Sequence, residues 1–321
     1  MRRRLLEQVR TGFKAVAEHA AHIQINYDLI PSYAISLLDA KTTVPEHDPA
    51  AHYLDQGDDT AAFFLTLDSI NFGSGYFPHM KKRPGLSGYF TVAGCLNDHF
   101  RENGPLSASE LSRLTVEDCF RIFEQDPQNR PIAGLMRLFA RALNDLGSYM
   151  QADFGGRFSG LISAAGASAE RLIQLLIRMP YFCDVALYDA VKVPFYKRAQ
   201  LAAADLSLAF KGRGLGHFDD LQNLTIFADN LVPHVLRVDH ILVYPEMLIQ
   251  HIESGKLIPA GSAAEIEIRA CALHTVEQLR AALNASGHAI TSMELDFLLW
   301  NRGQQPAYKS IPRHRTRSVF Y

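Results

Sequence analysis

The segment FYKRAQLAAADL, residues 195–206, places two cations at the start of a helix that is otherwise suited to burial. Lys197, Gln200 and Asp205 can share much of one face, because side chains three and four positions apart stack on a helix. The alanines between them let a second backbone approach closely. Two interpretations follow. Either Lys197 or Arg198 pairs with Asp205 or Asp184 at a docked helix end, or the two cations form the wall of an anion-binding pocket.

A carboxylate follows an apolar stretch in QNLTIFADNLVPHVL, residues 222–236. The apolar spacing predicts a helix that breaks at Asp229 and Asn230. A second helix is predicted to start near Pro233, since proline is tolerated in a first helical turn. In one interpretation Asp229 or Asn230 only caps the second helix. In the other, the Asp229 carboxylate, fixed between apolar neighbours, also stabilises a developing positive charge or positions a water molecule.

The C-terminal segment YKSIPRHRTRSVFY, residues 308–321, concentrates basic side chains, namely Lys309, Arg313, His314, Arg315 and Arg317. One interpretation is a solvated basic tail. The final residues Val319, Phe320 and Tyr321 are apolar or aromatic, however, and favour a packed terminus. A packed tail that carries cations inward is a better holder of a phosphate group than a loose one.

The composition is that of an ordinary globular protein, with 321 residues, 48% of them hydrophobic and 21% charged. The net charge of -2 argues against a long polyphosphate-binding groove, although a local basic pocket is compatible with it. Charges interrupt the N-terminal segment at Glu7, Arg10, Lys14 and Glu18, so neither a signal peptide nor a membrane span is expected. The four widely spaced cysteines and the unpaired histidines predict no metal site, and reduced thiols favour a cytoplasmic protein.

Helical periodicity dominates the chain. Helices are predicted at residues 5–21, 32–38, 132–149, 168–178, 195–211 and 263–286, with further helical spacing from residue 105 onward. Residues 60–70 are strongly apolar. Short strand candidates lie at residues 89–92 and 240–244, and the Pro- and Asp-rich residues 42–59 are predicted to form a surface connection. The expected fold is therefore mainly α, a compact multi-helix unit with a small β element.

Several of these segments occur together, in the same order, in one known family. The segments FxDxxxY at 182–188, FYKRAQ, LTIFADxxxPxVL, EIEIRACAL and HRTRSVFY resemble the queuosine salvage protein family. LDSINFGSGYF, GLSGYFTV and FGGRFSGLI fit it too, so the likeness spans nearly the whole chain. The resemblance implies a single domain over residues 1–321. In it, a helical part of about residues 1–100 packs on a part of about residues 105–321 that is similar to helix-hairpin-helix DNA glycosylases.

The resemblance also implies an activity. The family hydrolyses the N-glycosidic bond of queuosine 5′-monophosphate to ribose 5-phosphate and queuine, a 7-deazaguanine base that is salvaged for tRNA modification. No cofactor is implied, and the expected partner is this small-molecule substrate, with no membrane and no stable nucleic-acid complex. The family's catalytic aspartate falls on Asp229, and the lysine of its KRAQ motif falls on Lys197.

The chemistry assigns roles to these positions. A carboxylate at Asp229 would stabilise the oxocarbenium-like sugar and take a proton from the attacking water. Lys197 either contacts the ribose or phosphate, or lowers the pKa of the Asp229 carboxylate. Because a 7-deazapurine has a carbon in place of N7, the base must be assisted through another atom, for which Asp184 is a candidate. The full set of expected substrate-binding residues is Asn71, Phe72, Phe182 and Asp184 for the base, and Arg198, His314 and Arg315 for the phosphate.

Three other functions compete with this interpretation. A glycosylase that acts on a flipped base in DNA or RNA would share the architecture, and salt-dependent binding to duplex or tRNA would reveal it. A non-enzymatic binder of a modified nucleotide would tolerate Asp229→Asn without loss of biological effect. A helical interaction scaffold would expose an apolar face and lack a closed pocket.

Overall fold

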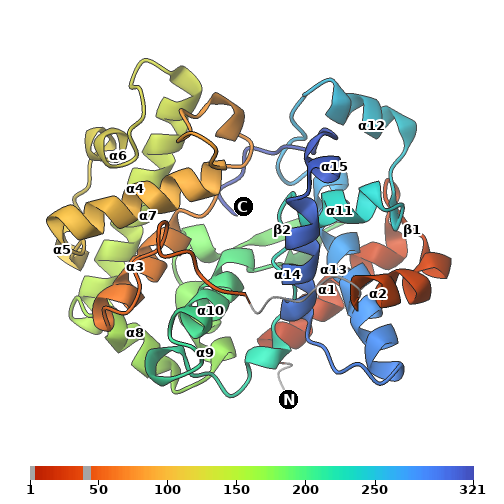
Figure 1. Ribbon diagram of the computed structural model, residues 1–321, viewed down its shortest axis with the longest axis horizontal. Helices are drawn as coiled ribbons and strands as arrows, with labels where there is room; N and C mark the ends of the chain where they lie inside the picture. Colours follow the sequence, from red (N-terminus) through yellow and green to blue (C-terminus); the bar gives the residue numbers. More distant parts are fainter. Residues whose placement is uncertain (1–3, 39–44) are drawn as a thin grey trace. The chain divides into compact units, whose positions relative to one another are not determined.

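The computed structural model describes residues 4–38 and 45–321, and these are mainly helical, as predicted (Figure 1). The chain divides into two compact units. Unit 1 consists of residues 1–44, 184–197 and 222–317, and unit 2 consists of residues 45–183, 198–221 and 318–321. Each unit is thus assembled from three separate segments. The division of the chain near residues 100–105 stays a prediction.

Unit 1 is organised by the long helix α13 (Ala263–Ala285), which packs against α1 (Leu5–His19), α2 (Ile30–Leu38), α11 (Val232–Val238) and α14 (Ser292–Gly303). Ser262 starts α13 as its N-cap, since its side chain accepts a hydrogen bond from Glu265 N. In α1 the buried Leu6, Val9, Phe13 and Val16 recur every three or four residues and form one apolar face. The remaining helices of this unit are η1 (Tyr27–Leu29), α12 (Glu246–Glu253) and α15 (Pro306–Lys309).

The strands found within the described residues form two short antiparallel pairs in unit 1. Strand β1 (Gln24–Ile25) pairs with β4 (Leu242–Val243), which confirms the strand predicted at residues 240–244. Strand β2 (Val185–Tyr188) pairs with β3 (Val191–Pro194) as a hairpin. Its two turn residues, Asp189 and Ala190, have φ of 44° and 64°. Two positive φ angles are the hallmark of a type I′ turn, whose twist matches that of the strands.

Unit 2 is organised by α7 (Arg130–Phe154), which packs against α3 (Asp58–Ser69), α5 (Ala108–Leu111), α6 (Val116–Ile122) and α8 (Phe158–Ala165). The side chain of Asn129 caps α7, Pro131 occupies its first turn, and Gly155 ends it in the left-handed conformation. The other helices are η2 (Phe77–His79), α4 (Gly88–Asn103), α9 (Ala169–Leu176), η3 (Pro180–Phe182), η4 (Gly214–Gly216) and most of α10 (Lys197–Ala209). The 3-10 helix η5 (Leu221–Asn223) begins at the last residue of the second segment of unit 2 and continues into unit 1.

Two local predictions are wrong. Residues 89–92 lie in the first turns of α4, where Ser87 accepts a hydrogen bond from Phe90 N, and they form no strand. The predicted helix before Asp229 is also absent: after η5, residues 224–228 are buried without regular structure. There the amide of Phe227 bonds to the carboxylate of Asp296 and not to a helical carbonyl.

The surface connection predicted at residues 42–59 is described only in part. Residues 42–44 lie outside the described residues, while Ala51 and His52 are buried. Nε2 of His52 lies 2.9 Å from the hydroxyl oxygen of Tyr89. This segment therefore contributes side chains to the interior of unit 2.

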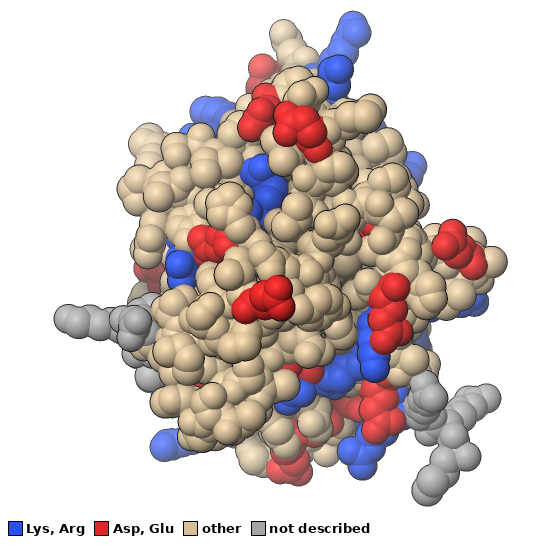
Figure 2. All heavy atoms as spheres, turned by 90° about the vertical axis from the view of Figure 1, so that its right-hand side faces the viewer, with Lys and Arg blue, Asp and Glu red and all other residues tan. Residues whose placement is uncertain are grey.

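Figure 2 shows one face of the molecule, where cationic and acidic side chains lie interspersed.

Candidate active site

The β2–β3 hairpin of unit 1 brings Asp184 and Lys197 together. Because Val185 pairs with Pro194, the residues that flank the hairpin lie side by side. The amide of Phe195 donates to the backbone oxygen of Asp184 at 2.9 Å. The amide of Lys197 donates a hydrogen bond to the Asp184 carboxylate at 3.4 Å. Asp184 and Lys197 are therefore neighbours through the Lys197 backbone, and both residues are buried.

The Asp184 carboxylate is bound by Arg269 of α13. Nη1 and Nη2 of Arg269 donate to the two carboxylate oxygens at 3.1 and 2.6 Å, a two-pronged arrangement. The guanidinium carbon lies 4.0 Å from the centroid of the Phe195 ring, and a carboxylate oxygen of Glu265 lies 3.8 Å from Nη1. Both partners of the Arg269–Asp184 pair are almost fully buried. The charges are thus held in a dry and well-defined geometry.

Asp229 lies in the turn that precedes α11. Its Oδ1 accepts a hydrogen bond from Leu231 N at 2.7 Å, which is the local side-chain turn that aspartate favours. The N-cap position of α11 is occupied by Leu231, so neither Asp229 nor Asn230 caps that helix as one interpretation predicted. Arg269 Nε donates to the backbone oxygen of Ala228 at 3.2 Å, and this contact ties the Asp229 turn to α13.

A second carboxyl group, Asp296 of α14, belongs to the same site. It is 6% exposed, and its Oδ1 accepts a hydrogen bond from Phe227 N at 2.9 Å. Burial raises the pKa of Asp296 to about 7, and the nearby charge of Asp229 contributes to the rise. The hydrogen bond from Phe227 and the charge of Lys197 act in the opposite direction and lower this pKa. A carboxyl group with this pKa carries its proton in a large fraction of molecules at neutral pH.

The basic residues of the C-terminal segment have different surroundings. Arg313 is partly buried; burial lowers its pKa, and the Asp229 carboxylate counteracts this. His314 is fully buried beside cationic groups, and its pKa is lowered to about 3, mainly by burial. Its Nε2 has no hydrogen-bond partner among the described residues. Arg315 lies against the loop after α12, where its guanidinium donates to the backbone oxygen of Gly255.

Three further predicted site residues come together in unit 2. The Arg198 guanidinium lies 4.9 Å from the ring centroid of Phe72 and 5.0 Å from that of Phe182. Its terminal nitrogens donate to four backbone oxygens, those of Asp68, Ser69, Tyr181 and Val319. Arg198 thus joins three segments of unit 2 by buried hydrogen bonds. Asn71 lies half-buried between Ile70 and Phe72, just after α3.

Asp296 and Arg269 are not among the site residues predicted from the sequence. Each carried a signal, because an ionisable residue within the apolar face of a helix requires a buried partner. Asp296 stands between the buried Leu295 and Leu298 in TSMELDFLL, and Arg269 stands within EIEIRACAL on α13. The identity of the partners could not be read from these patterns.

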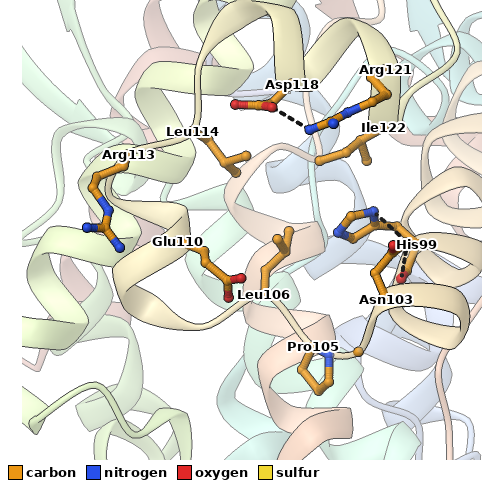
Figure 3. A pocket seen from close by; sticks show the side chains of 11 residues that line it. His99, Asn103, Pro105, Leu106, Glu110, Arg113, Leu114, Asp118, Arg121 and Ile122 are labelled. Atoms are coloured by element: carbon orange, nitrogen blue, oxygen red, sulfur yellow. Dashed lines mark hydrogen bonds and ion pairs between the residues drawn. The ribbon is translucent and has the colours of Figure 1, made fainter.

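Unit 2 contains a separate recess of about 400 Å³ beside α4, α5 and α6 (Figure 3). Its carboxylates serve the local helices: Glu110 accepts from Ser107 N at 2.8 Å, and Asp118 accepts from Thr115 N at 3.0 Å and pairs with Arg121. None of the predicted site residues lines this recess.

The described part of the chain has no cluster of three or more potential metal-ligating side chains. It also has no helix with the length and apolar character that a membrane span requires.

Comparison with known proteins places the chain in one family. A family model described as queuosine salvage protein matches residues 51–321. The chain is 37% identical over 318 residues to a queuosine 5′-phosphate N-glycosylase/hydrolase of Sphaerobacter thermophilus, covering 98% of this chain and 97% of the relative. Proteins of the same name from Dictyostelium discoideum and Mus musculus are 33% and 30% identical, covering 82% and 97% of this chain and 78% and 98% of their own lengths. The chain therefore belongs to the queuosine salvage protein family.

Proposed function

We propose that this chain is a hydrolase that cleaves the N-glycosidic bond of queuosine 5′-monophosphate, releasing queuine and ribose 5-phosphate for reuse of the base in tRNA modification. The observation that carries the proposal is the pair of carboxyl groups in unit 1. Asp229 is fixed in a turn by the amide of Leu231, whereas Asp296 is buried with its pKa raised to about 7. Two carboxyl groups in different environments can divide the base and acid tasks of glycosidic cleavage between them.

Asp229 acts on the sugar in this proposal. As the C–N bond breaks, positive charge develops at the anomeric carbon, and the carboxylate stabilises it electrostatically. Asp229 then takes a proton from the water whose oxygen bonds to that carbon. The hydrogen bond from Leu231 N holds the carboxylate in place, so that little reorganisation is needed during the reaction.

Asp296 acts on the base. The electron pair of the broken bond goes to the leaving base, and protonation of the base makes its departure easier. Because the deazapurine has no N7, the proton must be delivered to another nitrogen or to an oxygen of the base. Asp296 suits this task, since its raised pKa lets it keep a proton at neutral pH. Lys197, whose charge acts on Asp296, balances the negative charge of the site.

Arg313 is our choice for the 5′-phosphate. The charge of Asp229 acts on Arg313, which supports a position for Arg313 near the sugar end of the site. Within residues 4–38 and 45–321 Arg313 forms no ion pair of its own. The neighbouring His314 supplies a buried ring nitrogen. Arg198 is a weaker candidate, because its terminal nitrogens are already bound to backbone oxygens in unit 2. A guanidinium group can bind a phosphate through two parallel hydrogen bonds.

We further propose that the substrate is the free nucleotide, handled in the cytoplasm without a stable nucleic-acid complex. The net charge of -2 supports this, as does the mixture of charges on the face in Figure 2. Tight binding of duplex DNA or tRNA normally requires a surplus of cations that neutralise phosphates.

The test is a turnover assay in which the pure protein is incubated with queuosine 5′-monophosphate and free queuine is measured by mass spectrometry. Asp229→Asn and Lys197→Ala are assayed in parallel, with thermal melting as the check of folding. Queuine release that falls about 100-fold or more in folded Asp229→Asn is the expected result. Binding without release by the wild type would indicate a nucleotide-binding protein. Neither binding nor release would reject the substrate, and salt-dependent binding to tRNA would then be measured.

A further inference from the structure

We propose that Arg269 and Asp184 are positioning residues, and that together they set the distance between Lys197 and Asp229. This inference rests on the proposed function, because it concerns how the two proposed catalytic residues are held. It gives Asp184 a task different from the contact with the base that the family resemblance implies. All four residues belong to unit 1.

Arg269 contacts two chain segments that are distant in the sequence. Its terminal nitrogens bind the carboxylate of Asp184 at 3.1 and 2.6 Å, and its Nε binds the backbone oxygen of Ala228 at 3.2 Å. Ala228 is the immediate neighbour of Asp229. One planar guanidinium therefore fixes both the Asp184 side chain and the backbone that carries the proposed catalytic carboxylate.

Asp184 extends this connection to Lys197. Its carboxylate faces the Lys197 amide at 3.4 Å, and its backbone oxygen accepts from the amides of Phe195 and Tyr196 at 2.9 and 3.2 Å. The backbone at Ala228 is thus connected to the backbone at Lys197 by a series of hydrogen bonds that runs through Arg269 and Asp184. No step in this connection depends on an exposed or loosely held side chain, since Arg269 and Asp184 are 2% exposed.

Tyr196 shows why such a connection is needed. Its φ is 49°, a left-handed conformation that a bulky residue adopts only when its surroundings enforce it. Tyr196 immediately precedes Lys197, so a relaxation of this residue would turn the start of α10 and move the Lys197 side chain. The hydrogen bond from Tyr196 N to Asp184 and the contact of Phe195 with Arg269 both oppose that relaxation.

The geometry requires an arginine and not merely a positive charge. A lysine could neutralise Asp184, but its single ammonium group cannot form the two-pronged bond and also reach Ala228. Arg269→Lys therefore separates pairing of charge from positioning. We expect this variant to fold, with a kcat about 100-fold lower and a KM within about 3-fold of the wild type, since a small misplacement of catalytic groups has effects of this size.

Two further variants complete the design. Glu277→Gln is the control, because Glu277 also lies on α13 and forms a polar cluster with Arg10, Arg280 and Ser292 that does not touch Asp184 or Ala228. It should keep kcat within about 2-fold of the wild type. Phe195→Leu keeps an apolar side chain but removes the ring under Arg269, and should lower kcat several-fold. This milder change tests the proposal even if Arg269→Lys fails to fold.

Hydrogen–deuterium exchange gives a readout that does not depend on turnover. Amides of residues 195–198 and 227–231 should exchange faster in Arg269→Lys and in Phe195→Leu, and should be unchanged in Glu277→Gln. Wild-type kcat and wild-type exchange in either folded positioning variant would overturn the proposal. Failure of the proposed function looks different: the wild type itself would release no queuine, while the exchange pattern could still support the connection.

Discussion

The carboxylate of Asp296 accepts a hydrogen bond from the amide of Phe227, two residues before Asp229. This contact joins α14 to the turn that carries Asp229, the proposed general base of the reaction. It also means that the two carboxyl groups influence each other, since the charge of Asp229 contributes to the raised pKa of Asp296. A change in the protonation of one group is therefore transmitted to the other, and the pH dependence of the reaction should reveal it.

We expect Asp296→Asn to change the pH profile of kcat/KM. If Asp296 donates a proton, wild-type activity should fall as the pH rises through about 7, because the acid is then deprotonated. Asparagine can still accept the hydrogen bond from Phe227 N but cannot transfer a proton. The variant should be slower by about 100-fold at pH 6 and should lose the alkaline decline. A profile of unchanged shape would assign Asp296 a purely structural role.

Arg313→Gln should discriminate between the nucleotide and the nucleoside. If the guanidinium binds the 5′-phosphate, kcat/KM for queuosine 5′-monophosphate should fall by about 100-fold, since charge-assisted hydrogen bonds are among the strongest in proteins. Hydrolysis of queuosine without the phosphate should change little. Equal losses for both substrates would show instead that Arg313 acts through the charge of Asp229. Arg317→Gln, at an exposed position of the same segment, is the matched control.

Acid should destabilise unit 2 through its buried histidines. Burial lowers the pKa of His52 from 6.5 to about 4, as it does that of His47. As the pH falls below about 6.5, the unfolded chain takes up protons that the folded chain refuses, so the free energy of unfolding decreases until about pH 4. The loss can reach about 3 kcal/mol for one such histidine.

Urea unfolding at pH 7.5 and 5.0 measures this effect. His52→Gln should lower the stability at pH 7.5, because His52 lies within hydrogen-bonding distance of both Asp48 and Tyr89, and should make the difference between the two pH values smaller. His99→Gln, at a part-buried residue beside the recess of Figure 3, serves for comparison. An equal pH dependence in wild type and His52→Gln would contradict the assignment.

The sequence allowed the helical fold to be predicted because amphipathic segments such as residues 5–21 and 132–149 place apolar residues every three or four positions. It did not reveal the conformation of residues 224–228, where every side chain is buried and no polar face distinguishes a helix from an irregular buried segment. Likewise Ser87 starts a helix at residues whose short apolar pattern also suits a strand.

The candidate site could be predicted where its residues lie next to unusual neighbours. Asp229 was conspicuous between apolar residues, and Lys197 at the head of an alanine-rich helix. Arg269 is 85 residues from Asp184, and Asp296 is 69 residues from Phe227. Pairings over such separations follow from how the helices pack, so the sequence alone showed that buried charges needed partners but could not say which ones.

The interleaved composition of the two units has a consequence for biosynthesis. Unit 1 needs residues near the start of the chain together with residues 222–317, and unit 2 needs residues 318–321 to be complete. Neither unit can therefore be completed from one continuous stretch of chain, unlike a protein whose domains follow one another along the polypeptide. Many contacts close large loops, which slows folding. A cut at an internal boundary between these segments should therefore yield no independently stable fragment.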